Sequence, residues 1–206
     1  MGGKRDEILK VAEEVFAEKN FKGATMREIA EKVNIKKPAL YYHFRNKEDL
    51  YNSMIIEIYE QLQDRVLDPV KRGKSLDEKI RLLISHLVDF WAQHPAFPRI
   101  IAQEVISGSD LVYSELEPKF WMPMYQEILV EIEKEGSKEP EVNYVDPRML
   151  VINIFGMTIF YFFAGPVFTA ISGEDSFSSE NIEKLKEEVT SVVFNGMRKP
   201  GSRKRR

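Results

Sequence analysis

Residues 25–51 read TMREIAEKVNIKKPALYYHFRNKEDLY, which predicts a short helix, a turn near Asn34 and a second short helix that starts at Lys36 or Lys37. This is helix-turn-helix spacing. Asn34 is the residue after glycine best able to adopt the left-handed conformation of such a turn, and Pro38 falls in a first helical turn, where its missing N–H costs nothing. The apolar side chains fall where two short crossing helices share a core: Ile29, Val33, Ile35, Leu40 and Phe44.

The side chains of the second short helix that point away from this core are candidates to enter a DNA groove: Lys36, Lys37, Ala39, Tyr42 and His43. Lysines at a helix start gain nothing from the helix dipole, so a phosphate or a guanine edge is their natural partner. Thr25 and Lys47 stand at two further helix starts, where backbone N–H groups with a hydroxyl or an ammonium form a phosphate clamp. The alternative for Tyr41 and Tyr42 is that they pack against the protein instead of contacting DNA. Because helix neighbours point about 100° apart, we expect at least one of them to pack.

The wider pattern extends upstream, with F-x-x-K-N-F-x-G-A-T at residues 16–25 and L-Y-Y-H-F-x-N-K-E-x-L at residues 40–50. Over roughly residues 5–55 the chain resembles the DNA-binding domain of the TetR family of one-component bacterial transcription regulators. The resemblance implies phosphate contacts for Thr25 and Lys47, contacts to backbone or bases for Tyr41, Tyr42 and His43, and a base-reading turn with Lys37 and Ala39. Asn34 stands where the family usually has glycine. The predicted DNA-binding set is Thr25, Arg27, Lys36, Lys37, Ala39, Tyr41, Tyr42, His43 and Lys47.

Apolar residues recur at spacings of three and four along most of the chain, which predicts an all-α protein of about nine helices. Helix starts are marked by capping-box spacings at Thr25–Glu28 and Ser75–Glu78, by Asn46, and by the Asp146-Pro147 pair. We expect a three-helix helix-turn-helix domain at 1–50, a larger helical effector-binding and dimerisation domain at 51–197, and a disordered basic tail at 198–206. A long helix from Asn46 to about Asp68 would link the two domains.

Composition and charge agree with a globular protein that binds a polyanion. The chain has 206 residues, with 43% hydrophobic and 31% charged residues and no cysteine, which excludes disulfide scaffolds and thiol chemistry. The net charge of -3 hides an asymmetry: residues 1–50 hold 11 Lys and Arg against 9 Asp and Glu, and 198–206 hold 6 against none. The first residues lack an apolar signal region, so the expected compartment is the cytoplasm.

Aromatic and methionine residues are frequent beyond residue 68. Core packing is the default for each of them, but pockets are lined by the same residue types. Pro118 and Pro123 would kink or split a helix and open space beside it. We therefore expect a pocket for an apolar or aromatic effector, with candidate lining residues Phe90, Trp91, Phe120, Trp121, Met124, Tyr125, Phe155, Phe160 and Tyr161.

Residues 149–171 read MLVINIFGMTIFYFFAGPVFTAI and carry no charge over 23 positions, which is long enough to span a membrane. We rank that interpretation low because Asn153, Gly156 and Pro166 interrupt the run and the following flank is acidic. A helix that is apolar all round also arises when a partner subunit covers its outer side. The family pairs its last two long helices across a two-fold axis, here at about 146–165 and 179–197, and two recognition helices about 34 Å apart read a palindrome.

No enzyme motif occurs, and His86 and His94 are too far apart to hold one metal together, so we expect no catalysis, metal or cofactor. The sequence predicts a homodimeric, ligand-responsive DNA-binding regulator, a repressor released from a palindromic operator when an effector binds. The alternative is a constitutive dimeric DNA-binding protein with no effector. A fully packed second domain favours the alternative, and a cavity lined by Trp91, Trp121 or Phe160 favours the regulator.

Overall fold

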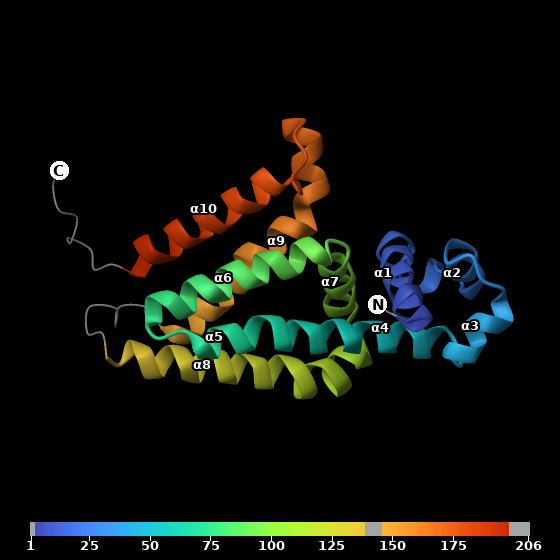
Figure 1. The fold of residues 1–206 in the computed structure, drawn as a ribbon, viewed down its shortest axis with the longest axis horizontal. Helices are drawn as coiled ribbons and strands as arrows, with labels where there is room; N and C mark the ends of the chain where they lie inside the picture. Colours follow the sequence, from blue (N-terminus) through green and yellow to red (C-terminus); the bar gives the residue numbers. More distant parts are fainter. Residues whose placement is uncertain (1–2, 139–145, 198–206) are drawn as a thin grey trace. The chain divides into compact units, whose positions relative to one another are not determined.

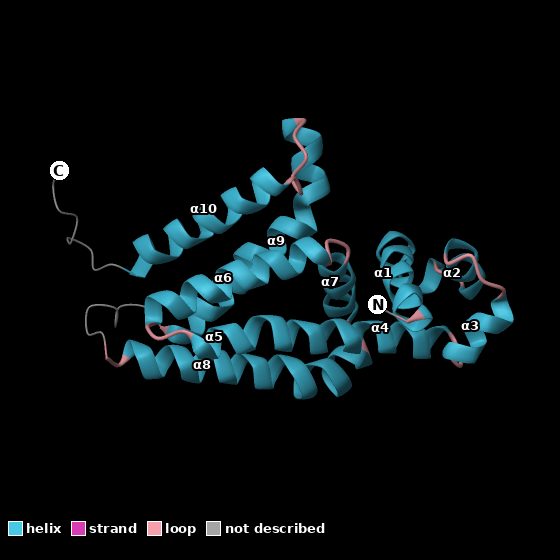
Figure 2. Cartoon of the chain, in the orientation of Figure 1, coloured by secondary structure: helices cyan, strands magenta, loops and turns pink. Residues whose placement is uncertain are grey.

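The computed structural model describes residues 3–138 and 146–197, and this part of the chain is helical (Figures 1 and 2). Its elements are α1 (Lys4–Gly23), α2 (Met26–Lys32), α3 (Lys37–His43), α4 (Lys47–Leu62), the π-helical segment η1 (Gln63–Leu67), α5 (Asp68–Arg72), α6 (Leu76–Gln93), α7 (Phe97–Ser107), the π-helical segment η2 (Val112–Trp121), α8 (Met122–Gly136), α9 (Pro147–Ser172) and α10 (Ser179–Met197). Since α4, η1 and α5 follow one another without a break, as do η2 and α8, the described residues form nine uninterrupted helical runs. The predicted all-α fold of about nine helices is confirmed.

Helix ends lie where the local sequence signals place them. Thr25 caps α2 in a capping box with Glu28, the Ser75 side chain accepts from the backbone N–H of Glu78, and Asp146 caps α9 ahead of Pro147. Among the residues that the structure describes, the two with positive φ other than glycine are Asn20 and Asn34, both with φ of 56°. Asn20 kinks the end of α1, and Asn34 makes the turn between α2 and α3.

Packing divides the chain into two compact units. Among the described residues, unit 1 holds 3–61 and 96–118, and unit 2 holds 62–95, 119–138 and 146–197. In unit 1, α7 packs against α1, and the rings of Tyr59 and Phe97 meet edge to face at 5.4 Å. The packing units therefore place α4 and α7 with the N-terminal helices, whereas the predicted domain limits of 1–50 and 51–197 separate them. Those limits remain a prediction, and the predicted tail at 198–206 lies outside the described residues.

Unit 2 is built around α6, which contacts α5, α8, α9 and α10. The buried face of α6 carries nine side chains: Leu76, Lys79, Ile80, Leu83, Ile84, Leu87, Val88, Phe90 and Trp91. Figure 1 shows α9 crossing behind α6 and then projecting beyond it before the chain returns along α10. Phe162 on α9 stacks on Phe177 with ring centres 5.6 Å apart, which ties the projecting part of α9 to the loop that precedes α10.

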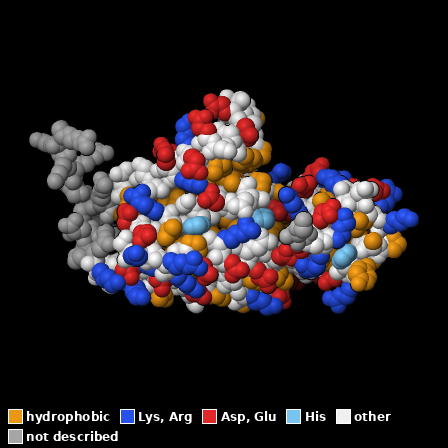
Figure 3. Space-filling view, viewed as in Figure 1, with side chains coloured by type: hydrophobic (Ala, Val, Ile, Leu, Met, Phe, Trp, Pro, Cys, Tyr) orange, Lys and Arg blue, Asp and Glu red, His pale blue; other side chains and the backbone are white. Residues whose placement is uncertain are grey.

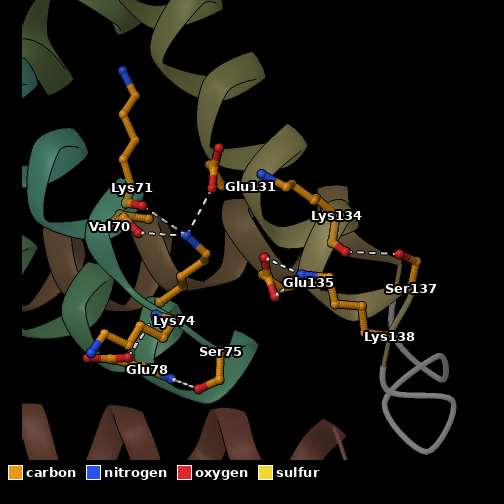
Figure 4. A network of polar contacts seen from close by, with 11 residues as sticks. Val70, Lys71, Lys74, Ser75, Glu78, Glu131, Lys134, Glu135, Ser137 and Lys138 are labelled. Carbon is orange, nitrogen blue, oxygen red and sulfur yellow. Dashed lines mark hydrogen bonds and ion pairs between the residues drawn. The ribbon is translucent and has the colours of Figure 1, made fainter.

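A buried lysine holds the end of α5 in unit 2. Lys79 is only 2% exposed, and its ammonium donates to the backbone oxygens of Val70 at 3.1 Å and Lys71 at 3.3 Å and to the Glu131 carboxylate on α8 at 2.9 Å. Figure 4 shows Val70, Lys71 and Glu131 around this contact. Gly73 makes room for it, since a Cβ there would lie 2.8 Å from Lys79 Cγ. The last carbonyls of α5 and a carboxylate of α8 are thus satisfied by one cation.

The two π-helical segments lie in two regions where the sequence made predictions about helix continuity: the long helix from Asn46 and the prolines at 118 and 123. The long helix predicted from Asn46 to about Asp68 runs through α4, η1 and α5 to Arg72. Pro118 lies inside η2, and Pro123 lies in the first turn of α8. A π turn relaxes the backbone register locally, so the chain accommodates Pro118 by widening the helix rather than by splitting it.

Candidate DNA-binding site

The core of unit 1 positions α3 with one face outward. Leu40 and Phe44 are buried, as are Ile29 and Val33 on the α2 side. The turn at Asn34 is closed by the N–H of Ile35, which donates to the Ala30 oxygen at 2.9 Å. The predicted base-reading residues of α3 lie on the opposite face, where Lys36, Lys37 and Ala39 are exposed.

Both tyrosines of α3 are exposed, Tyr41 at 43% and Tyr42 at 87%. The expectation that at least one of them packs into the core is therefore wrong. The Lys37 ammonium lies 5.7 Å from the centre of the Tyr41 ring, and the Tyr42 ring meets the half-buried His43 ring edge to face at 5.3 Å. The outer face of α3 consequently offers cations and flat aromatic rings together, a combination suited to phosphates and base edges.

Thr25, predicted as a phosphate contact, already serves as a helix cap. Its hydroxyl donates to Glu28 Oε2 at 3.0 Å and accepts from the Glu28 N–H, and its own N–H donates to the same carboxylate oxygen at 3.1 Å. The hydrogen bond from Lys19, followed by that from Thr25, lowers the pKa of Glu28. The capping carboxylate therefore stays ionised beside Thr25, and a phosphate contact at this residue would have to compete with it.

Lys47, the other predicted phosphate clamp, is half-buried. Its ammonium donates to the backbone oxygens of Phe21 at 2.7 Å and Ala24 at 3.1 Å, and it lies 4.5 Å from the centre of the Phe21 ring. These carbonyls belong to the end of α1 and the residue after it, so Lys47 joins that end to the first turn of α4. Two of its three N–H groups are used, and the third remains for a phosphate.

We expect a Lys47→Ala variant to bind every DNA sequence more weakly by a similar factor and to lower the slope of log affinity against log salt by about one. The variant should also lose a little stability because two carbonyls of unit 1 lose their partner. Fluorescence anisotropy over a salt series measures the slope, and Lys10→Ala, an exposed lysine of α1, is the control. An unchanged slope would show that Lys47 acts on the fold alone.

Two exposed arginines lie on α2 and just after α3. Arg27, in the predicted set, pairs with Glu31 at 3.3 Å on α2. Arg45 follows α3 directly; its guanidinium pairs with Asp49 at 3.4 Å, and its backbone N–H donates to the same carboxylate at 2.8 Å. That backbone hydrogen bond lowers the pKa of Asp49. The sequence analysis missed Arg45, although its position two residues before Lys47 is a signal that could have found it.

The nine candidate residues for an effector pocket do not share one environment. Phe90, Trp91, Phe120 and Met124 are buried, while Trp121, Tyr125, Phe155 and Tyr161 are half-buried. Phe160 is 57% exposed on α9, which suits an interface better than a pocket. The Trp91 side chain is 2% exposed, and its indole N–H has no hydrogen-bond partner among the described residues. None of the three cavities described within 3–138 and 146–197 is lined by any of the nine, so the cavity expected of a ligand-responsive regulator is not among them.

Two other kinds of site, a metal centre and a membrane span, concern the same part of the chain. Among the described residues, no group of three or more His, Cys, Asp or Glu is placed to hold a metal ion. The helix α9 is long and apolar enough to cross a membrane by length and composition, with 39% of its most apolar window buried in the protein. The core helix of a protein outside the membrane passes the same test.

Comparison with known proteins gives one consistent family. A family model described as bacterial regulatory proteins, tetR family, matches residues 8–54, and one described as tetracyclin repressor-like, C-terminal domain, matches residues 77–193. The chain is 26% identical to the HTH-type transcriptional regulator RutR of Escherichia coli strain K12, over 96% of this chain and 92% of RutR.

Two solved structures show the same fold. AibR in complex with isovaleryl coenzyme A and operator DNA matches with a TM-score of 0.72 at 17% identity, over 93% of this chain and 98% of that one. FadR from Bacillus subtilis in complex with stearoyl-CoA matches with a TM-score of 0.69 at 22% identity, over 93% and 98% of the two chains. With its helix-turn-helix matched and more than half of its length covered by the second family model, this chain belongs to the TetR family of DNA-binding transcriptional regulators and is not an enzyme.

Proposed function

We propose that this regulator is a homodimeric repressor that binds a palindromic operator and releases it when an acyl-CoA thioester binds unit 2. The observation that carries the effector half of this proposal is the indole N–H of Trp91, which is buried and has no hydrogen-bond partner among the described residues. Trp91 lines none of the described cavities, so an effector that binds there has to open the packing of unit 2. A buried donor without an acceptor costs about 1–3 kcal/mol, so such groups are rare unless a partner arrives. The carbonyl oxygen of a thioester is an acceptor of the right kind, and Phe90, whose ring meets Trp91 edge to face at 5.2 Å, is an apolar neighbour suited to an acyl chain.

Two fold relatives support the choice of effector class, because both were solved with an acyl-CoA bound. This narrows the apolar or aromatic effector expected from the sequence to one with a long or branched acyl group. As a cytoplasmic regulator, the protein would meet such thioesters where they are made and consumed.

The dimer half of the proposal rests on α9. One stripe of this helix is exposed at spacings of three and four, and Gly156 stands in the middle of it, where a Cβ would meet no described atom within 4 Å. Its apolar members are Met149, Ile152, Phe160, Phe163, Val167 and Ile171. Figure 3 shows hydrophobic side chains at the base of the projecting part, below its largely polar tip. A row this long on the surface of a monomer fits burial against a second copy, and a glycine at its centre lets two helices approach closely.

The opposite side of α9 is packed inside unit 2. Leu150, Val151, Ile154, Phe162 and Gly165 are buried there, in a helix that contacts α6, α8 and α10. A membrane span would need an apolar surface all round in contact with lipid. A helix with one side in its own core and one exposed stripe is better explained by a two-fold partner.

The test has two stages. Selection of duplexes from a random library should enrich a palindrome with half-sites about one helical turn apart. Titration of acyl-CoA chains of different length into that complex, with free coenzyme A as control, should then lower the affinity for DNA. Enrichment without any response to acyl-CoA would leave the constitutive DNA-binding protein as the better description, and failure to enrich any duplex would contradict specific readout.

We expect Trp91→Phe to bind the acyl-CoA about fivefold more weakly, because the substitution removes one hydrogen bond and keeps the aromatic bulk. Isothermal titration calorimetry on the native chain and the variant measures the ratio. Equal affinities would show that the indole N–H does not contact the effector.

A further inference from the structure

A cavity of about 800 Å³ lies within unit 1. Its walls are the end of α1, the first turns of α4, and the segment from the end of α7 to Glu115. This volume falls in the range of small-molecule pockets, about 300–1,000 Å³. The lining is separate from both the candidate DNA contacts and the effector candidates, so the two functions considered above leave this cavity unexplained.

The charge of the lining is strongly negative. Four carboxylates face one lysine, Lys22, and they come from α4, α7 and the segment after α7: Glu48, Glu104, Asp110 and Glu115. Carboxylates gathered around a cavity raise the local concentration of cations and repel anions. The phosphates of coenzyme A are excluded by the same field, so this cavity is not the acyl-CoA site.

Acceptors outnumber cations in the lining, although the amides of Asn20, Asn52 and Gln103 also bring donors. The hydroxyl of Ser107 donates to the Glu104 backbone oxygen at 3.1 Å, and that of Ser114 donates to the Asp110 backbone oxygen at 2.6 Å. With their protons used, these hydroxyls offer only lone pairs. An alkylammonium has three donors and no acceptor, so it matches a lining of carboxylates and of hydroxyls whose protons are already donated to backbone oxygens.

Two aromatic rings complete the wall. The ring centres of Phe21 and Tyr51 lie 5.0 Å apart, and the Tyr51 hydroxyl donates to Glu104 Oε1 at 2.6 Å. Burial, followed by the hydrogen bond to Glu104, raises the pKa of Tyr51, so it remains a neutral donor that fixes the carboxylate. Phe21 is half-buried, so methylene groups of a ligand can pack against its exposed part, whereas Tyr51 is buried and acts through Glu104.

We propose that this cavity binds an aliphatic diamine or polyamine, with Glu104 and Glu48 as the two main anchors of its ammonium groups. A ligand with at least two cationic ends fits because the carboxylates come from separate elements, α4 and α7. The bound amine ties the end of α7 to α1 and α4 and cancels negative charge next to Lys47. It therefore raises the affinity of the protein for DNA. The proposal does not depend on the acyl-CoA effector.

Isothermal titration calorimetry with putrescine and spermidine, on the full chain without DNA and at fixed ionic strength, tests this directly. We expect one site with a dissociation constant below about 1 mM. The Glu48→Gln/Glu104→Gln variant should bind at least tenfold more weakly, while an amide oxygen at 104 can still accept from Tyr51. Glu14→Gln/Glu60→Gln, which removes two exposed carboxylates of α1 and α4 outside the cavity, is the matched control and should bind as the native chain does.

A second variant distinguishes loss of the binding site from unfolding caused by the Glu48→Gln/Glu104→Gln substitutions. Asn52→Lys places an ammonium in the cavity from within and should abolish amine binding while circular dichroism still shows the native helix content. The proposal is overturned if neither amine gives heat up to about 10 mM, or if the two double variants lose affinity equally. Magnesium binding with the same affinity as spermidine would also overturn it, because diffuse attraction of counterions would then account for the signal.

Discussion

A Phe163→Glu variant is expected to be monomeric and to bind the palindromic operator at least about 100-fold more weakly than the native chain. Phe163 lies in the exposed stripe of α9, so two copies of the substitution would place carboxylates against each other in a dimer seam. Charges buried without partners cost several kcal/mol, which is enough to separate the subunits. A monomer engages one half-site only, and loss of the second linked contact lowers affinity by about 10²–10⁴-fold.

Analytical ultracentrifugation measures the oligomeric state, and fluorescence anisotropy compares the full palindrome with an isolated half-site. Val130→Glu is the matched control, because it adds the same charge in place of an exposed apolar side chain on α8. The Phe163→Glu variant should keep the native affinity for a half-site, since Phe163 lies outside the unit that holds α3. A Phe163→Glu protein that is still dimeric would place the subunit interface elsewhere.

We expect Lys79→Met to lower the free energy of unfolding by about 3 kcal/mol. The substitution keeps the length and the apolar stem of the side chain but leaves two backbone carbonyls of α5 and the Glu131 carboxylate without their donor. Glu131 is 23% exposed on its side chain and can recover some hydration, so the cost should stay below that of a fully buried pair. Chemical denaturation followed by circular dichroism measures the difference.

Two comparisons separate this role from a general loss of charge. Lys71→Met removes the lysine that pairs with Glu127 at the surface at 2.5 Å, and it should cost less than about 1 kcal/mol. Lys79→Met/Glu131→Leu removes both partners of the inner pair and should recover part of the loss. Equal losses of unfolding free energy for Lys79→Met and Lys71→Met would contradict the interpretation that the buried Lys79 ammonium stabilises the fold by binding the α5 carbonyls and Glu131.

The helix-turn-helix could be predicted from residues 25–51 because each of its signals acts within a few positions. The Thr25–Glu28 capping box, the left-handed Asn34 and the first-turn Pro38 need no knowledge of the rest of the chain. The same holds for the helix starts at Ser75 and Asp146. Local hydrogen bonds and steric limits decide such features, and they are visible in sequence.

Other features depended on partners far along the chain. Lys47 was predicted from its helix start, but its two carbonyl partners come from 23 and 26 positions earlier. Lys79 reads as an ordinary charge on α6 and is buried only because Glu131, 52 residues later, lies beside the end of α5. Tyr41 and Tyr42 were expected to include one core residue, yet Leu40 and Phe44 already fill the space beneath α3.

By itself, the sequence determined the all-α class, the helix-turn-helix with its outward face, and the family, because short-range periodicity and capping specify them. The tertiary structure alone decided that α7 packs with the N-terminal helices and that an acid-lined cavity forms beside Tyr51. It also decided that the indole N–H of Trp91 is buried without a partner in the described part of the chain. These features depend on contacts between segments far apart in the sequence, such as that between Tyr51 and Glu104. No local sequence pattern indicates which segments will meet.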